Sequence, residues 1–379
     1  MLIPKDQFVG IENVAHLATG GESPMLKSHQ QAIGRFFEHK AQGEMARHQL
    51  EATHQRTKEK TAQLFSVEPE SITFLSSASD GINLLAHSID WHPGDNVVVA
   101  DVEFPSDVLP WTHFADQGVE IRIVRHRDWR IHLEDVQALI DDRTRVVAMS
   151  YVSYFTGQRQ DLPALSKLVR QSNAIFLLDA THAAGVVPVE AHYADIMVSS
   201  CYKFLLGVHG TGIFYWNRER LPDLKPPFLG WNTGQSIPSW DAPTDYVLKA
   251  NADRFQPGNP SFLSIYVLEN ALDHFLDIGL TQVEEHVLTL SGEVWGGLTD
   301  AGWSVMTPQH GLQRAGNICF EAPNIDDITK QMAQKGVLIW GSYGGVTRVR
   351  VSTHLFNDSQ DVQRFLSGLA ELVPIPQLS

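Results

Sequence analysis

Two charged residues stand at the ends of apolar runs in the middle of the chain. Asp179 ends the run AIFLLD (residues 174–179), and Lys203 follows the run DIMVSS (residues 195–200). Open α/β sheets bind ligands at the carboxyl ends of their strands, so both side chains are expected beside one site. Apolar and glycine neighbours would desolvate Lys203, which lowers the pKa of the amine and makes it a nucleophile toward carbonyl groups. Taken alone, each residue has a simpler explanation, a helix-capping acid and a solvated surface lysine.

A third feature lies upstream, in the stretch FLSSASDGINLLAHSI (residues 74–89). It predicts a strand, a turn of small polar residues and a helix, so that residues 76–79 offer backbone N–H groups, hydroxyls and a helix N-terminus to an anion. A plain serine-capped helix is the alternative. A phosphate cradle, a strand-end acid and a desolvated lysine are together what pyridoxal phosphate requires, so this cofactor is predicted.

His182, three residues after Asp179, is a further candidate. No third ligand follows at a zinc-like spacing, so no metal site is expected. Gly207, Gly210 and Gly212 come after Lys203, whereas a mononucleotide loop needs its glycines before the lysine, and that type of site is not expected either.

Short apolar runs alternate with helical stretches through the first two thirds of the chain. Such runs are typical of strands buried on both faces, and the alternation predicts an α/β fold with a mostly parallel, seven-stranded sheet. The seven runs are residues 72–75, 96–101, 120–124, 145–150, 174–179, 195–200 and 212–216.

The pattern changes after about residue 225, where a segment rich in Pro, Gly, Ser and Trp predicts an ordered loop. Helical spacing then predicts a helix over about 263–280 and a final helix over about 359–372. We expect a large cofactor-binding domain at residues 16–262 and a small α+β C-terminal domain at residues 263–379, joined by residues 1–15.

These motifs, in this order, resemble the class V aminotransferase-like enzymes from about residue 15 to 370. This superfamily of fold-type I PLP-dependent transferases includes cysteine desulfurases, isopenicillin-N epimerase-like enzymes and kynureninases. The resemblance implies that Lys203 (CYKFLLG) forms the Schiff base with pyridoxal phosphate, that Asp179 (DATHAAG) contacts the ring nitrogen and that His182 lies near the ring oxygen. It also implies that Ala78 and Ser79 (SSASDGIN) contact the phosphate.

Four further positions match family motifs. Phe104 (EFPSDVLPW) would stack on the cofactor ring, where desulfurases commonly have histidine, and core packing is the alternative. Tyr202 would contact the phosphate, as in kynureninase, and Asn259 (RFQPGNPSF) would reach the phosphate of a neighbouring subunit. Arg350 (VRVSTHLFN) would bind the substrate carboxylate, whereas Arg348 on the same strand face is not assigned a role, and both could instead be solvated.

The resemblance implies an enzyme that acts on the α-amino group of an amino acid through an imine link with Lys203, of the aminotransferase or lyase type. Transamination, elimination and epimerisation stay open, with an amino-acid epimerase as the alternative. A cysteine desulfurase is not expected, because Cys201 and Cys319 lie in strand-like runs and GSYGGVT (residues 341–347) contains no cysteine.

Composition sets the wider limits. The 379 residues carry a formal net charge of −15, which disfavours nucleic-acid partners and anionic membranes. A cytoplasmic protein is predicted. The chain has only two cysteines, its N-terminus lacks the apolar core of a signal peptide, and it contains no run of about 18 apolar residues. The resemblance implies a homodimer with shared active sites.

Two other classes of function fit the sequence less well. A dinucleotide-dependent oxidoreductase would need a Gly-x-Gly-x-x-Gly turn between an early strand and a helix, but GVHGTG (residues 207–212) precedes a strand. A scaffold without activity would not need the lysine and the aspartate, and both are present.

Overall fold

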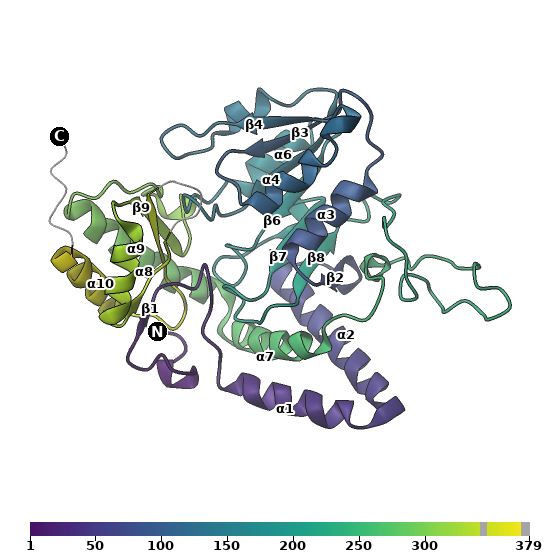
Figure 1. The fold of residues 1–379 in the computed structure, drawn as a ribbon, viewed down its shortest axis with the longest axis horizontal. Helices are drawn as coiled ribbons and strands as arrows, with labels where there is room; N and C mark the ends of the chain where they lie inside the picture. Colours follow the sequence, from purple (N-terminus) through teal and green to yellow (C-terminus); the bar gives the residue numbers. More distant parts are fainter. Residues whose placement is uncertain (342–346, 373–379) are drawn as a thin grey trace.

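A seven-stranded sheet forms the centre of the computed structural model, which describes residues 1–341 and 347–372 (Figure 1). The strand order is β2-β8-β7-β6-β5-β3-β4, and the pairs are parallel except that β8 runs antiparallel to both of its neighbours. The strands are β2 (Ile72–Leu75), β3 (Asn96–Ala100), β4 (Glu120–Val124), β5 (Thr144–Ser150), β6 (Ile175–Asp179), β7 (Ile196–Ser200) and β8 (Gly212–Trp216). The predicted α/β fold and its mostly parallel sheet are confirmed.

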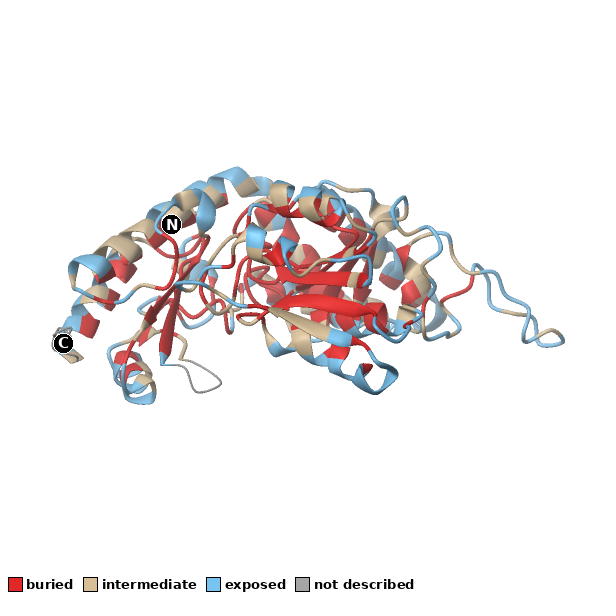
Figure 2. Cartoon of the chain, turned by 90° about the horizontal axis from the view of Figure 1, so that it is seen from above, coloured by how far each residue is buried: buried red, intermediate tan, exposed pale blue. Residues whose placement is uncertain are grey.

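Helices cover both faces of this sheet, which is why its inner strands are apolar on both sides. Alternate residues enter opposite cores, as Val97 packs with α3 (Ala78–Ser88) and α4 (Pro105–Thr112), whereas Val98 packs with the other layer. Figure 2 shows the strands buried beneath these layers. The other layer includes α2 (Ala46–Phe65), α6 (Leu162–Val169) and α7 (Phe262–Ile278), with α1 (Ser28–Lys40) packed against α7 and α5 (Leu133–Gln137) against α6.

A smaller α+β unit packs beside the sheet. Its strands β9 (Asn317–Glu321) and β11 (Arg348–Ser352) pair antiparallel, and β1 (Ala15–His16) pairs parallel with β10 (Val337–Leu338). The N-terminal segment is therefore part of this unit. Its helices are α8 (Leu280–Asp300), α9 (Ile325–Gln334) and α10 (Ser359–Leu372).

The predicted division between residues 262 and 263 falls at the start of α7. This helix packs against α1 and α2 of the large part, while the small unit proper begins with α8. The exact domain division stays a prediction. Short 3-10 helices lie at Lys5–Gln7, Gly43–Met45, Pro69–Ser71, Ala115–Gln117, Ala191–Tyr193, Ala252–Phe255 and Gly311–Gln313.

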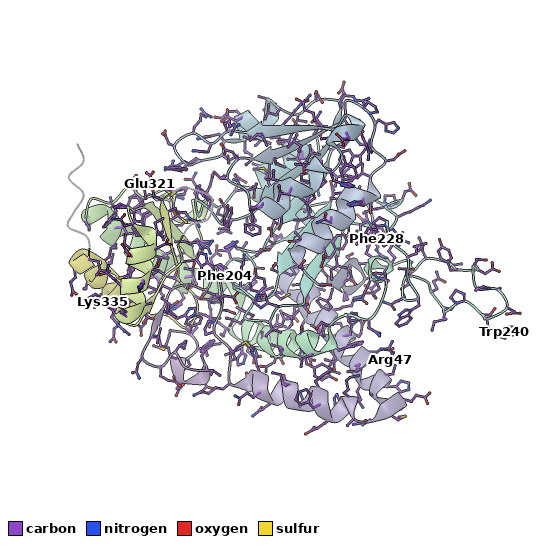
Figure 3. All side chains as sticks on the ribbon, in the orientation of Figure 1. Arg47, Phe204, Phe228, Trp240, Glu321 and Lys335 are labelled. Atoms are coloured by element: carbon purple, nitrogen blue, oxygen red, sulfur yellow. The ribbon has the colours of Figure 1, made fainter. Side chains whose placement is uncertain are left out.

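An extended arm, residues 234–248, projects from the large part (Figure 1). Its base is closed by an antiparallel bridge between Gly234 and Leu248 and by the bond from Gln235 N–H to the carbonyl of Val247. Trp240, at the tip, is 93% exposed and far from the body of the molecule (Figure 3). No helix in the described part of the chain has the length and hydropathy needed to cross a membrane.

Candidate active site

A small cavity of about 90 Å³ opens at the carboxyl ends of β6 and β7, next to the N-terminus of α3. Strand ends and a helix N-terminus meet here because the β2–α3 turn brings the start of the helix over the same sheet edge. Most of the predicted site residues line this cavity: Ala78, Ser79, Phe104, Asp179, His182, Tyr202 and Lys203.

Lys203 is buried in the wall of the cavity. Its Nζ lies 3.2 Å from Nε2 of His182 and 5.4 Å from the centroid of the Phe104 ring. Burial, and after it the positive charge of Arg350, lowers the pKa of Lys203 to about 8. A sizeable fraction of the amine is therefore neutral, and nucleophilic, in mildly alkaline solution.

His182 is held between Lys203 and the small unit. Its Nδ1 accepts a hydrogen bond of 3.0 Å from the amide nitrogen of Asn317, whose amide oxygen accepts from the Ser352 hydroxyl at 2.8 Å. The ring proton therefore sits on Nε2, toward Lys203. Burial, followed by the charge of Lys203, lowers the pKa of His182 well below its usual range, so the ring is neutral.

Asp179 ends β6 and is fixed by its own turn. Its Oδ1 accepts a hydrogen bond of 2.7 Å from the N–H of Thr181, and the Thr181 hydroxyl accepts one of 3.0 Å from the N–H of Ser200. These bonds hold the ends of β6 and β7 together. The carboxylate of Asp179 and the amine of Lys203 therefore face one cavity from neighbouring strands.

The N-terminus of α3 lies close to the start of β8. Ser77 caps the helix by accepting a hydrogen bond of 3.1 Å from the N–H of Asp80, and the Ser79 hydroxyl lies 2.8 Å from that of Ser106. A Cβ atom on Gly212 would lie 2.4 Å from the carbonyl carbon of Ser77, so only glycine allows this approach. Uncapped N–H groups at a helix N-terminus suit a phosphate.

Two buried acids behind the cavity were not among the predicted site residues. Glu103 accepts a hydrogen bond of 2.9 Å from the N–H of Ser150, and burial raises the pKa of Glu103 to about 7 against the effect of this bond. Asp107 is fully buried, and burial, followed by the charge of Asp179, raises its pKa well above the usual range. Both acids occur in the motif EFPSDVLPW, but their burial leaves no signal in it.

Arg348 and Arg350 both point from β11 toward the large part, and neither is solvated, since both are buried. Arg350 Nη1 donates to the carbonyl oxygen of Tyr154 at 3.0 Å, and Arg348 Nη1 donates to the same oxygen at 2.6 Å. The Tyr154 ring lines the cavity and stands edge-on to Phe104, with 5.2 Å between ring centroids.

Arg350 and Asn259 lie outside the wall of the cavity. Asn259 lines a separate surface pocket of about 480 Å³ together with Phe228 and Gln256. The ring of Tyr202, which does reach the cavity, stacks on His209 with 4.0 Å between centroids. Tyr154 and Asn317 are further site residues that the sequence did not single out, and Asn317 carries no local signal because it lies in an ordinary apolar strand.

The described residues offer neither a metal site nor an exposed thiol. Within residues 1–341 and 347–372, no group of three His, Cys, Asp or Glu side chains could hold a metal ion. Cys201 and Cys319 are both fully buried, and burial raises the pKa of each thiol. The cysteine-free stretch GSYGGVT lies largely outside the described residues.

The match to a family model fits this geometry. The model of the class-V aminotransferases covers residues 23–365, so the chain belongs to this family. A buried lysine, a strand-end acid and a helix N-terminus around one cavity suit pyridoxal phosphate, which the family and its solved complexes use. The predicted cofactor and the prediction of a PLP-dependent enzyme that acts on an amino acid are confirmed.

Similar curated proteins include cysteine desulfurases. A probable cysteine desulfurase of Methanothermobacter thermautotrophicus is 26% identical over 84% of this chain and 83% of its own length. A cysteine desulfurase of Salmonella agona is 29% identical, over 80% and 78%. The apo structure of a cysteine desulfurase from Thermococcus onnurineus superimposes with a TM-score of 0.88 at 23% identity, covering 98% of both chains.

A further solved structure is the cystine C-S lyase C-DES in complex with its reaction product, cysteine persulfide. It matches with a TM-score of 0.88 at 19% identity, over 97% of this chain and all of its own. The prediction that the protein is not a cysteine desulfurase is therefore wrong, because two relatives that match over 80% or more of the chain are named cysteine desulfurases and the structure of another superimposes on nearly the whole chain.

Proposed function

We propose that this protein cleaves the Cβ–S bond of L-cysteine, as a cysteine desulfurase. The names of its relatives support this reaction. The observation that carries the proposal is the contact of 3.2 Å between Lys203 Nζ and His182 Nε2 inside a cavity that Asp179 and the start of α3 also line. A lysine of lowered pKa beside a neutral histidine suits proton transfer at a substrate carbon.

The cofactor has identifiable partners in this proposal. Asp179 would hold the ring nitrogen, Ala78 and Ser79 at the α3 N-terminus would hold the phosphate, and Phe104 would pack on the ring face. Asn259 and Tyr202 are further phosphate contacts, the former from a second subunit. When bound, pyridoxal phosphate supplies an electron sink for a negative charge that develops at the substrate Cα.

Lys203 transfers the proton, and His182 positions Lys203. The neutral Lys203 amine takes the proton from Cα and returns one to the product carbon. His182, its tautomer set by Asn317, holds the Lys203 amine in place through Nε2. Arg350 pairs with the substrate carboxylate, which fixes Cα relative to Lys203.

The sulfur leaves to an acceptor thiol. The balanced reaction converts L-cysteine and a thiol, RSH, into L-alanine and the persulfide RSSH. The two cysteines of the chain are buried with raised thiol pKa values, so an external thiol is the acceptor that we propose.

The same burial favours a second candidate, cleavage of L-cystine, the activity named for C-DES. Cystine and water give pyruvate, ammonia and cysteine persulfide, and no acceptor thiol is needed. The Lys203 proton transfer at Cα is common to both reactions, whereas the final carbon product differs.

Product analysis tests the proposal. The cofactor-loaded enzyme, given L-cysteine and dithiothreitol, should release alanine and sulfide in equal amounts. Lys203→Ala should lower the rate by at least about a thousandfold, because the base at Cα is lost, and should abolish borohydride trapping of the cofactor. Pyruvate formed from cystine without added thiol would establish the second candidate, and turnover of neither substrate would refute both.

We further propose a cytoplasmic homodimer whose sites are completed across the subunit interface. The two free, buried cysteines suit a reducing compartment. Asn259 lies away from the cavity of its own chain, and the nearby arm exposes apolar side chains, both of which suit contact with a second copy.

A further inference from the structure

Arg348 is a buried cation without a counter-ion. Its side chain has no exposed surface, and no carboxylate of the described residues lies within salt-bridge distance of it. Its Nη1 donates to the carbonyl oxygens of Tyr154 at 2.6 Å and Phe155 at 3.2 Å, while Nε has no partner. Burying an uncompensated charge is costly, so this position calls for an explanation beyond packing.

The Tyr154 carbonyl joins this residue to Arg350. The oxygen accepts one hydrogen bond from each arginine, 2.6 Å from Arg348 and 3.0 Å from Arg350, which uses both of its lone pairs. The two arginines occupy alternate positions of β11 and so share one face of the strand. Their guanidinium groups are therefore fixed relative to each other by a single atom of the large part.

Arg348 also supports the ring that forms the cavity wall. Its Cζ lies 5.5 Å from the centroid of the Tyr154 ring and 5.0 Å from that of Phe155, within cation–π range. The Tyr154 ring in turn stands edge-on to Phe104. Arg348 itself does not line the cavity, so it reaches the site only through other residues.

We propose that Arg348 is a positioning residue for substrate binding: it fixes the Tyr154 carbonyl, and through it the guanidinium of Arg350, where a substrate carboxylate docks. This rests on the proposed role of Arg350 toward an amino-acid carboxylate. Loss of Arg348 removes one of the two hydrogen bonds to the Tyr154 carbonyl, so this carbonyl holds the Arg350 guanidinium less firmly and the carboxylate binds less well. Steps at Cα depend on Lys203 and are left intact once substrate is bound.

The test compares binding of L-alanine with that of its methyl ester. Neither has a leaving group on Cβ, and only the free acid offers a carboxylate to Arg350. Dissociation constants are read from the absorbance change of the bound cofactor in wild type, Arg348→Met and Arg348→Lys. We expect Arg348→Met to weaken L-alanine binding roughly tenfold while ester binding changes less than about twofold, because one oriented charged hydrogen bond is affected.

Arg348→Lys, which keeps the charge but not the planar fork, should fall between wild type and Arg348→Met. With L-cysteine, the Arg348 variants should show a raised KM and a kcat close to that of wild type. Arg159→Met is the matched control, because Arg159 is also mostly buried and also bridges the two parts, through Glu284 on α8, yet lies away from the cavity. It should lower the Tm and leave both dissociation constants unchanged.

Every other outcome contradicts either the positioning role of Arg348 or the proposed function. Equal weakening of acid and ester, or weakening of neither, overturns the positioning role of Arg348. A similar loss of acid binding in Arg159→Met would show a general effect of loosening the two parts and would also overturn it. If wild type gives no spectral response to any amino acid, the proposed function itself fails, which is distinguishable from failure of this inference.

Discussion

At the scale of single residues, the site is a small array of buried charges. Glu103, Asp107 and Asp179 are its acids, and Lys203 and the β11 arginines are its cations. Such an array stabilises the fold poorly, because each charge loses its hydration. Its effect is instead to shift pKa values, since burial lowers the pKa of Lys203 and raises those of Glu103 and Asp107.

Glu103 offers a pH test of this description. Its pKa is raised to about 7, chiefly by burial, so its ionisation costs stability that is absent below the usual carboxyl pKa and grows as pH rises through about 7. Glu103→Gln should therefore match wild type at about pH 4 and gain up to roughly 3 kcal/mol in the free energy of unfolding at pH 8. Urea denaturation of the cofactor-free proteins measures this, and a difference that does not change with pH would contradict it.

The sequence identified residues whose neighbours are unusual for their type. Lys203 follows a strand and precedes glycines, and Asp179 ends an apolar run. Both residues could therefore be recognised as candidate site residues from their neighbours in the sequence. Asn317 and Asp107 could not be found in this way. Their roles depend on the small unit docking on the sheet and on helix α4 turning inward, which are contacts between distant segments.

At the scale of elements, β8 shapes the side of the cavity formed by the N-terminus of α3. Because it runs antiparallel to β2 and β7, its first residue, Gly212, lies beside the turn that opens α3. A Cβ there would meet Ser77 and Ala78 backbone atoms at 2.4 to 2.8 Å, and backbone cannot move aside cheaply.

Gly212→Ala should therefore displace the N-terminus of α3. We expect a loss of about 1–3 kcal/mol in stability and a higher dissociation constant for pyridoxal phosphate, measured by denaturation and by cofactor absorbance. Gly296→Ala is the control, since its Cβ would meet nothing within 4 Å and alanine favours the helix α8. Equal cofactor affinity of the two variants would refute the role assigned to Gly212.

The strands were predictable as elements because burial on both faces makes them continuously apolar. Each of the seven predicted runs coincides with a strand to within a residue or so, and the last predicted helix matches α10. The reversed direction of β8 was not predicted, since an apolar run carries no sign of its orientation. The segment after about residue 225, predicted as an ordered loop, includes the arm. The projection of the arm from the large part was not predicted, because it depends on contacts that a local pattern does not encode.

At the scale of the whole molecule, the arm is the feature that a single chain leaves unexplained. Its apolar side chains lie open to solvent, and a monomer gains nothing from exposing them. These residues are Ile237, Trp240, Tyr246 and Val247.

Shortening the arm tests the proposed homodimer. Replacing residues 236–246 by Asn-Gly should keep the fold, because the Gly234–Leu248 bridge already holds the two ends together. We expect the Tm of the body to stay within a few degrees and the dimer dissociation constant to rise by about tenfold or more, measured by analytical ultracentrifugation. An unchanged dimer would show that the arm contacts something else, and a monomeric wild type would refute the dimer.

The expectation that excluded cysteine desulfurases failed at this same scale. That prediction required an accessible cysteine in the chain. The proposed proton transfer at the substrate Cα by Lys203 and the transfer of sulfur to a thiol are, however, separate steps. A thiol from another molecule can perform the second, so the burial of Cys201 and Cys319 does not decide the first.

The pairing of β1 with β10 has a consequence for the order of folding. The segment that holds β1 bonds to residues more than three hundred positions later in the sequence, as Leu2 N–H donates to the carbonyl of Leu355 and Lys5 pairs with Asp361. Contacts between residues so far apart in the sequence form slowly. We therefore expect the central sheet to assemble first and the small unit, which carries Arg350 and Asn317, to dock beside the cavity in a later step.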